Sequence, residues 1–182
     1  MNYSARFCSF FAGAVAAVCL FASCAPPGQA VGDSISVGIA ATAAVHIDAS
    51  GGRTTYSAGY GPGTGSGLDA VRRLAPKVKV HGWVIIELGT NDVAVQADTP
   101  GQYLSRISQL TNAVPADRCV AFVTVKRPTY AARAQSWNTS VRAVLKQRPC
   151  WRVIEWAAAA TAFPSYTTAD GFHPSETGKR YL

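Results

Sequence analysis

Three short segments of the sequence contain the residue types that nucleophilic catalysis needs. They are Gly32-Asp33-Ser34, Gly89-Thr90-Asn91-Asp92 and Asp170-Gly171-Phe172-His173-Pro174. A serine hydroxyl is a weak nucleophile, so a base must take its proton while it attacks an ester carbonyl. His173 is the candidate base for Ser34, and Asp170 in the same segment can fix the tautomer of the imidazole and stabilise its charged form. A lone Gly-Asp-Ser is typical of a turn, but the three segments together predict a reactive serine.

The other polar residues near these segments have simpler interpretations. Of the three histidines, His46 lies in a predicted strand and His81 just before one, where histidine is more often structural or exposed. We therefore expect neither to take part in catalysis. Asp33 and Asp92 flank the reactive residues, and we expect their carboxylates to hold the turns through hydrogen bonds from backbone N–H groups.

Apolar runs alternate with helical patterns along the chain, which predicts a parallel sheet with helices on both faces. The candidate strands are Gln29–Gly32, Ala43–Asp48, Trp83–Leu88, Val120–Lys126 and Trp151–Trp156. The third and fourth are almost continuous in Val, Ile, Leu and Phe, as expected of strands buried on both sides. We predict the flavodoxin-like strand order 2-1-3-4-5, in which ligands bind beyond the carboxyl ends of the strands.

Three apolar sets recur at helical spacing between these strands. They are Leu68, Val71 and Leu74; Leu104, Ile107, Leu110 and Val114; and Ala134, Trp137, Val141 and Val144. The first predicted helix ends before Pro76, and the second has Thr99 and Pro100 as its N-cap and first turn. The Gly-rich run from Gly59 to Gly67 has neither the spacing of a dinucleotide fingerprint nor the Lys of a phosphate loop, so we interpret it as a mobile loop.

In this order, the reactive segments resemble the serine, asparagine and histidine blocks of the SGNH (GDSL-like) hydrolase family over residues 31–182. The resemblance implies a three-layer flavodoxin-like α/β fold of about five parallel strands. It also implies a catalytic triad of Ser34, Asp170 and His173. The domain would then be a serine hydrolase that acts on ester bonds.

The same resemblance implies an oxyanion hole with three hydrogen-bond donors. They are the backbone N–H of Ser34, the backbone N–H of Gly52 and the side-chain amide of Asn91. Gly52 follows the second predicted strand, where the family has a glycine, and Gly51 is the alternative. Glycine suits this position because a backbone without a Cβ can approach the substrate closely.

A narrower resemblance is to the SGNH domains associated with membrane acyltransferases that modify envelope glycans. It rests on Gly32-Asp-Ser, Ile47-Asp-Ala-Ser-Gly-Gly-Arg, Glu87-Leu-Gly-Thr-Asn, Trp156-Ala-Ala and Asp170-Gly-Phe-His. We favour a serine esterase that hydrolyses short acyl esters on an envelope glycan or lipid. Two alternatives stay open, namely an O-acyltransferase that uses the same triad on envelope glycans and an inactive glycan-binding module.

Several other classes of function lack their sequence signals. No Gly-x-Ser-x-Gly elbow is present, so the larger α/β-hydrolase lipases are a poor match. No His or Cys cluster has metal-ligand spacing, and we infer no metal and no cofactor. The formal charge is +7, but the cations are scattered rather than clustered with aromatic residues, which argues against a nucleic-acid site. Arg53, Lys126 and Arg127 lie near the predicted catalytic edge and could meet an anionic or sugar substrate.

Residues 1–24 have the pattern of a secretory signal, with Arg6 before an almost unbroken apolar run from Phe7 to Ala22. This run is shorter than the ~20 residues of a membrane-spanning helix, so we favour a signal over a permanent anchor. Residues 25–182 are then one exported domain, which we expect to be a monomer. We expect to find it in the cell envelope or outside the cell.

The cysteines agree with export. Phe21-Ala-Ser-Cys24 resembles a lipoprotein box whose Cys24 would be acylated, and cleavage near Ala25 or Ala30 is the alternative. Cys119 and Cys150 lie beyond the signal, and such a pair predicts one disulfide in an oxidising compartment. Two buried free thiols are the alternative. In the predicted strand order the pair lies at the starts of the fourth and fifth strands, away from the edge where ligands bind.

Overall fold

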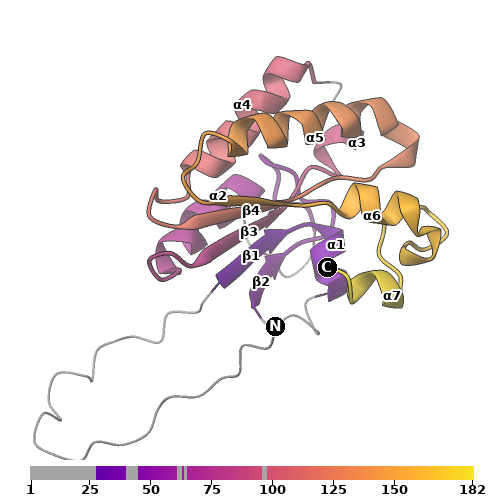
Figure 1. Cartoon of the computed structure of the whole chain (residues 1–182), viewed down its shortest axis with the longest axis horizontal. Helices are drawn as coiled ribbons and strands as arrows, with labels where there is room; N and C mark the ends of the chain where they lie inside the picture. Colours follow the sequence, from indigo (N-terminus) through magenta and orange to yellow (C-terminus); the bar gives the residue numbers. More distant parts are fainter. Residues whose placement is uncertain (1–27, 40–44, 61–62, 64, 96–97) are drawn as a thin grey trace, which may run out of the picture.

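Figure 1 shows a computed structural model of the chain, which describes residues 28–39, 45–60, 63, 65–95 and 98–182. The predicted signal segment, residues 1–24, lies outside these ranges together with Cys24. Residues 43 and 44 of the second predicted strand and residues 61, 62 and 64 of the Gly-rich run lie outside them too. The predictions that concern those residues stay predictions.

The described strands form one parallel five-stranded sheet in the order β2-β1-β3-β4-β5. They are β1 (Gly28–Gly32), β2 (His46–Ala49), β3 (Trp83–Glu87), β4 (Cys119–Val123) and β5 (Trp151–Ile154). The inner strands β1 and β4 are buried along their whole length, whereas the edge strands β2 and β5 are partly exposed. The predicted strand order is therefore confirmed, and the carboxyl ends of all these strands share one edge.

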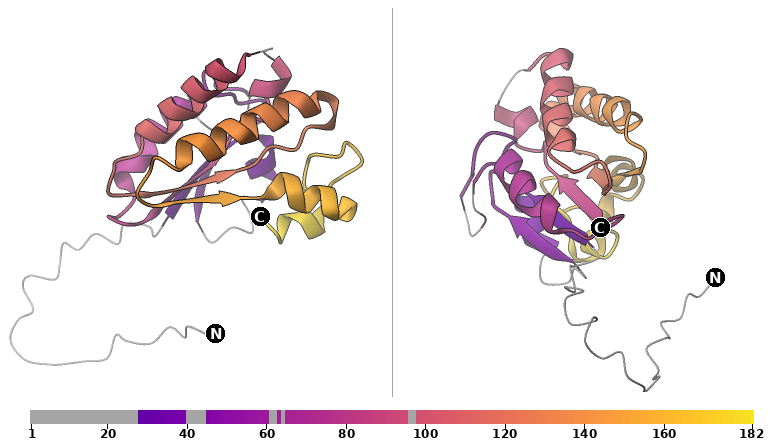
Figure 2. Two further views of the ribbon diagram at one scale, coloured as in Figure 1. Left: turned by 45° about the horizontal axis from the view of Figure 1, so that its top comes forward. Right: turned by 90° about the vertical axis from the view of Figure 1, so that its left-hand side faces the viewer.

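Helices cover both faces of the sheet, which confirms the predicted three-layer α/β architecture (Figures 1 and 2). The helices are α1 (Ser34–Ile39), α2 (Gly67–Leu74), α3 (Asp92–Val95), α4 (Pro100–Asn112), α5 (Ala131–Leu145), α6 (Trp156–Ala162) and α7 (Glu176–Lys179), with 3₁₀ turns η2 (Ala75–Lys77), η3 (Pro128–Tyr130) and η4 (Pro164–Tyr166). The larger apolar cluster lies between the sheet and α2, α4 and α5. A smaller cluster lies on the other face, around Trp156 of α6.

Two predicted strands extend past the ends of the observed ones. β4 ends at Val123 and β5 at Ile154, although the apolar residues continue beyond both. Val125 is buried in the larger apolar cluster, and its N–H and carbonyl bond to the Asn138 side chain at 2.7 and 2.8 Å. Trp156 is buried because it begins α6 and packs in the smaller cluster. Buried apolar residues in the loop after β4 and at the start of α6 therefore resemble a continuation of the strands in the sequence.

The predicted apolar helix faces are buried with one exception. Leu104 is 39% exposed, whereas Tyr103 beside it is 1% exposed. Tyr103 and Leu104 are both at helical spacing from Ile107, so spacing alone does not choose between them. The structure selects Tyr103, whose ring packs edge-on against Trp137 with 5.5 Å between centroids. The predicted start of this helix is confirmed, since Thr99 forms a capping box at the N-terminus of α4.

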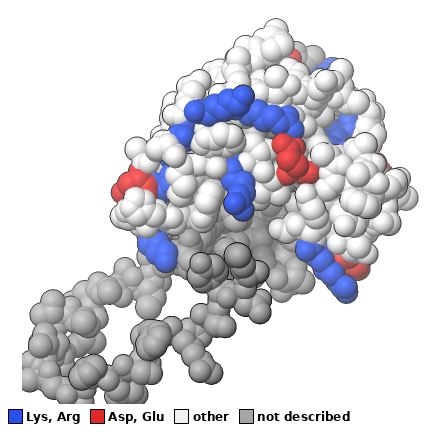
Figure 3. Space-filling model, in the orientation of Figure 1, with Lys and Arg blue, Asp and Glu red and all other residues white. Residues whose placement is uncertain are grey.

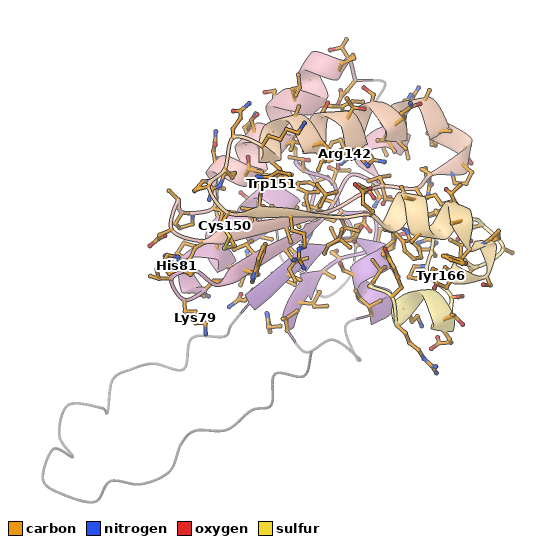
Figure 4. All side chains as sticks on the ribbon, viewed as in Figure 1. Lys79, His81, Arg142, Cys150, Trp151 and Tyr166 are labelled. Atoms are coloured by element: carbon orange, nitrogen blue, oxygen red, sulfur yellow. A yellow bond between two sulfur atoms is a disulfide. The ribbon has the colours of Figure 1, made fainter. Side chains whose placement is uncertain are left out.

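The predicted disulfide between Cys119 and Cys150 is present, with the two Cα atoms 4.8 Å apart. Cys119 begins β4 and Cys150 directly precedes β5, so the bridge joins the amino ends of neighbouring strands. Figure 4 shows Cys150 and His81 at one end of the molecule and Tyr166 at the other. The bridge is thus a structural link away from the carboxyl edge of the sheet.

The charged side chains are spread over the surface. Figure 3 shows Lys and Arg atoms at several separate places on one face, with Asp and Glu atoms between them. This distribution agrees with the scatter of cations along the sequence. None of the helices within the described ranges combines the length and apolar content needed to cross a lipid bilayer.

Removing the bridge with the double change Cys119→Ala and Cys150→Ala should lower the free energy of unfolding by about 3–4 kcal/mol. The reason is that the bridge closes a 31-residue separation and so restricts the unfolded chain. Urea unfolding of the oxidised protein and of the double variant measures the difference, and reduced wild type should match the variant. A loss below about 1 kcal/mol would show that the bridge restrains the unfolded chain little.

Candidate active site

Ser34 lies at the start of α1, directly after the turn that follows β1. The Asp33 carboxylate holds this turn, as predicted, because its Oδ1 accepts the Ile35 N–H at 3.0 Å. Gly32 is required at the turn, since a Cβ there would lie 1.9 Å from the Ser36 hydroxyl oxygen. The strand-to-helix turn therefore depends on the Gly-Asp pair and presents the Ser34 side chain at the carboxyl edge of the sheet.

The serine and histidine segments meet at this edge. Ser34 Oγ lies 2.9 Å from His173 Nε2, and His173 Nδ1 lies 2.6 Å from Asp170 Oδ2. The two ring nitrogens have different partners, so one can accept a proton from the hydroxyl while the other donates to the carboxylate. The side chains of His173 and Asp170 are 35% and 39% exposed, so this contact is open to water.

The loop that carries His173 folds around the Asp170 carboxylate. Asp170 Oδ1 accepts the N–H groups of Phe172 and His173, both at 3.0 Å, and the Thr168 hydroxyl at 2.9 Å. Burial alone would raise the pKa of Asp170, but the hydrogen bonds from Phe172 and His173 outweigh it and hold that pKa well below its usual range. Asp170 is therefore a carboxylate at neutral pH, which suits a partner of Nδ1–H.

The Asn91 side chain lies beside the serine turn and the Gly52 loop. Its amide nitrogen donates to Asp33 Oδ2 and to the Arg53 carbonyl, each at 3.2 Å. Both amide hydrogens thus have protein acceptors, and one of them must be exchanged before Asn91 can donate to a ligand. Gly52 has φ +70°, and a Cβ there would lie 2.7 Å from the Tyr60 ring. The left-handed backbone distinguishes Gly52 from Gly51, the alternative glycine.

The Asp92 carboxylate connects the Asn91 turn to the Gly52 loop, a contact that the surrounding sequence does not indicate. We expected its carboxylate to hold its own turn. The structure instead shows both carboxylate oxygens 3.1 Å from the Thr55 N–H, on the loop that follows Gly52. Burial raises the pKa of Asp92. The Asn91 turn and the Gly52 loop are therefore fixed to each other by a buried carboxyl group.

Two of the three cations expected near a substrate have structural contacts. Arg53 is fully buried, and its guanidinium donates to the Asp48 carbonyl, the Asp48 carboxylate and the Gly32 carbonyl at 2.8, 2.8 and 3.3 Å. The expectation that Arg53 meets substrate is therefore wrong. Lys126 Nζ donates to the Ala160 carbonyl at 2.5 Å. Arg127 differs from both, because its guanidinium lies over the Phe172 ring.

The remaining histidines lie at the amino ends of strands. His46 is exposed at the start of β2, and His81 is exposed in the turn before β3 with φ 61°. Of the three, His173 alone lies at the carboxyl edge with the serine. In the part of the chain that the structure describes, no group of three or more His, Cys, Asp or Glu side chains is placed to hold a metal ion.

A buried pair of carboxyl groups behind the serine turn was missed by sequence reasoning. Glu87 Oε2 accepts the N–H of Asp33 and of Ser36, both at 3.2 Å, and the Ser36 hydroxyl at 3.0 Å. Burial raises the pKa of Asp33 to about 6, and burial together with the charge of Asp33 raises the pKa of Glu87 well above its usual range. Both Asp33 oxygens accept hydrogen bonds, so we assign the proton of the pair to Glu87. The sequence feature that could have indicated this pair is Glu87, an acidic residue at the end of an apolar strand.

No family model and no curated protein matches the chain. Solved structures do match it. TesA is 21% identical with a TM-score of 0.63, over 85% of this chain and 93% of that one. The C-terminal catalytic domain of peptidoglycan O-acetyltransferase A from Streptococcus pneumoniae is 16% identical with a TM-score of 0.59, over 85% and 86%. A lipolytic G-D-S-L family protein from Veillonella parvula is 14% identical with a TM-score of 0.64, over 85% and 92%.

The chain has the SGNH-hydrolase fold. At these identities the likeness concerns the arrangement of strands and helices rather than the chemistry, so the function has to be argued from the side chains. The expected fold is confirmed, and the SGNH fold brings the Ser34 turn, the Asn91 turn and the His173 loop to one edge of the sheet (Figure 1).

Glu87→Gln should change how stability depends on pH. A buried acid whose pKa is raised by folding makes the folded state less stable as pH rises from its unfolded-state pKa, about 4.3, through its folded-state value. Glutamine keeps the acceptor oxygen without the ionisation. The variant should therefore gain stability relative to wild type above about pH 4, by about 1.4 kcal/mol for each unit of the pKa difference.

Urea unfolding from pH 4 to 9 measures this effect in wild type and variant. Glu176→Gln is the matched control, because that side chain is 85% exposed in the salt bridge it makes with Lys179. Parallel stability profiles for wild type and Glu87→Gln would contradict a protonated Glu87.

Proposed function

We propose that the protein is an exported serine esterase that hydrolyses short-chain carboxylic esters through an acyl-enzyme on Ser34. The observation that carries this proposal is the position of the His173 ring, which contacts the Ser34 hydroxyl with one nitrogen and the Asp170 carboxylate with the other. That arrangement is the one that turns a serine hydroxyl into a nucleophile. The SGNH-hydrolase fold supports the same conclusion.

In the first step Ser34 Oγ attacks the ester carbonyl carbon while His173 Nε2 takes its proton. Asp170 accepts Nδ1–H, holds the ring in the required tautomer and stabilises the imidazolium that forms. The carboxylate is suited to this because several hydrogen bonds keep it ionised. The tetrahedral intermediate then collapses, and His173 returns the proton to the leaving alcohol. The acyl group stays on Ser34.

The negative charge on the former carbonyl oxygen requires donors that are already in place. We assign them to the N–H groups of Ser34 and Gly52 and to the side-chain amide of Asn91. The contact between the Asn91 amide and the Arg53 carbonyl supports this set, because it puts the amide beside the Gly52 loop. When substrate binds, its oxygen takes the place of one of the two present acceptors of the amide. Each such donor contributes about 3–4 kcal/mol to lowering the barrier.

In the second step a water molecule attacks the acyl-enzyme, and His173 acts again as base. The imidazole is 35% exposed, so water reaches the acyl-enzyme readily, as hydrolysis requires. The signal-like segment and the disulfide between Cys119 and Cys150 support export. The likeness to a peptidoglycan O-acetyltransferase domain supports an envelope glycan as the carrier of the acyl group.

Ser34→Ala should reduce hydrolysis of an aryl acetate to the background rate, because the acyl-enzyme no longer forms. Release of the phenol measures turnover, and circular dichroism and urea unfolding show that the fold is kept. Ser105→Ala, at an exposed position on α4, is the matched control and should keep full activity.

Turnover by Ser34→Ala equal to that of wild type would reject the esterase proposal. Wild type that transfers the acyl group to an added glycan and releases no free acid would replace hydrolysis by transfer at the same serine. Mass spectrometry of glycan and acid distinguishes these results.

Asn91→Ala should lower kcat about 10²–10³-fold and change KM little, because the amide acts on the charge that develops in the transition state. Initial-rate kinetics on the same aryl acetate measure both constants. Asn112→Ala, at an exposed position at the end of α4, is the control. An unchanged kcat would exclude Asn91 as an oxyanion donor.

A further inference from the structure

A pocket of about 360 Å³ lies between the segment after β4, the first part of α5 and α6. Its polar lining residues are Lys126, Arg127, Gln135, Asn138, Arg142 and Thr161. Alanine, valine and proline side chains line the rest, and the lining residues found in the described ranges include no Asp or Glu. Figure 4 shows Arg142 on α5, between the disulfide end of the molecule and the end with Tyr166.

One wall of the pocket packs against the loop that carries His173. The Arg127 guanidinium lies 3.8 Å from the centroid of the Phe172 ring, and that centroid lies 4.1 Å from the centroid of the His173 ring. Pro128 packs on the same loop, since a Cβ on Gly171 would lie 3.1 Å from Pro128 Cγ. Arg127, which lines the pocket, is therefore connected to the imidazole through a single aromatic ring.

The pocket carries a positive charge that the surrounding carboxylates balance only in part. Arg142 pairs with Glu155 at 2.7 Å, and Lys126 donates to a backbone carbonyl. Arg127 contacts an aromatic face, and its Nε is buried with no hydrogen-bond partner among the residues that the structure describes. Because Nε has no exposed surface, an anion would have to reach Arg127 through the terminal nitrogens of its guanidinium, which no carboxylate among the described residues neutralises.

The proposed reaction indicates which part of a substrate reaches this pocket. The acyl oxygen must face the oxyanion donors, which lie with Gly52 and Asn91. The leaving alcohol must face His173, because the imidazolium returns its proton to that oxygen. Arg127 lies just beyond the imidazole on the Phe172 side. A substituent on the alcohol part of the ester would therefore extend toward Arg127.

We propose that this pocket binds an anionic group, a carboxylate or a phosphate, on the alcohol part of the ester substrate, with Arg127 as the residue that contacts it. The proposal rests on the proposed esterase function and names the substrate class of that site. A guanidinium stacked on Phe172 keeps its plane fixed, and its N–H edge can then bind a carboxylate or phosphate with paired hydrogen bonds. The uncharged Gln135 offers a further donor, whereas the Thr161 hydroxyl already donates to the Ala157 carbonyl at 2.7 Å.

The test compares three acetyl esters of similar shape in wild type and Arg127→Gln. They are para-acetoxybenzoate, para-acetoxyphenyl phosphate and the neutral methyl para-acetoxybenzoate. The variant should lose about tenfold or more in kcat/KM for at least one anionic ester, while the value for the neutral ester changes less than about threefold. The anionic ester with the larger loss identifies the carboxylate or the phosphate as the preferred group.

Arg152→Gln is the matched control, because it removes the same charge from exposed β5, where the guanidinium lies 6.0 Å from the Trp83 ring. Arg152→Gln should leave unchanged the ratio of kcat/KM for each anionic ester to kcat/KM for the neutral ester. An equal loss for all three esters in Arg127→Gln would overturn the proposal and leave Arg127 as a residue that only positions the His173 loop. An equal ratio change in Arg152→Gln would overturn it too, since net charge would then explain the preference.

A binding measurement separates this proposal from the esterase function. Titration of Ser34→Ala with para-acetoxybenzoate and para-acetoxyphenyl phosphate, followed by NMR, should give saturable shifts that Arg127→Gln abolishes in the same background. Such binding without turnover in wild type would reject the esterase function and keep the anion site. Absence of binding of both anions would reject the anion site.

Discussion

The hydrogen bond between Ser34 and His173 joins two residues that are 139 positions apart in the sequence. It forms because Ser34 follows the inner strand β1 and the chain returns to the carboxyl edge of the sheet after β5. The return is fixed by the segment after α6, where Thr167 pairs with Pro174 and the Ser175 N–H donates to the Tyr166 carbonyl at 2.8 Å. A change that shifts this last segment would separate base and nucleophile without touching either of them.

Buried polar groups, rather than apolar packing, hold the loops of the site in register. Asp33 connects the serine turn to Asn91, and Asp92 connects the Asn91 turn to the loop after Gly52. Arg53 connects that loop to the end of β2 through Asp48. A buried charge without a partner is strongly unfavourable, so each of these contacts restricts the loops to one arrangement. The edge of the sheet is thus preorganised before a substrate binds.

The sequence predicted the parts of the fold that follow from strong local patterns. The continuous apolar runs marked the inner strands, and the strand order placed Cys119 and Cys150 together. The ends of β4 and β5 were wrong because Val125 and Trp156 are buried in loops and helix starts rather than in strands. Leu104 was wrongly predicted on the buried helix face, because Tyr103 satisfies helical spacing equally well and is the buried residue.

In the candidate site, the sequence motifs identified the residues, but they did not indicate the buried polar contacts that hold these residues in place. Nothing in the spacing indicates that Arg53 is buried, since its partners are the Gly32 carbonyl and the carbonyl and carboxylate of Asp48, which only the folded backbone brings together. The sequence also does not indicate that the carboxyl groups of Asp33 and Glu87 lie together, because their contact depends on the register between β1 and β3. Contacts of this kind are tertiary, and a single sequence carries no pattern for them.

The central claim is that His173 activates Ser34, and the rate at which a fluorophosphonate probe labels the protein tests it most directly. The rate is measured in wild type and in folded His173→Ala, and the modified residue is mapped by peptide mass spectrometry. We expect a single modification at Ser34 in wild type and labelling slowed by about 10²-fold or more without the imidazole. Modification at another residue, or the same rate in both proteins, would contradict the claim.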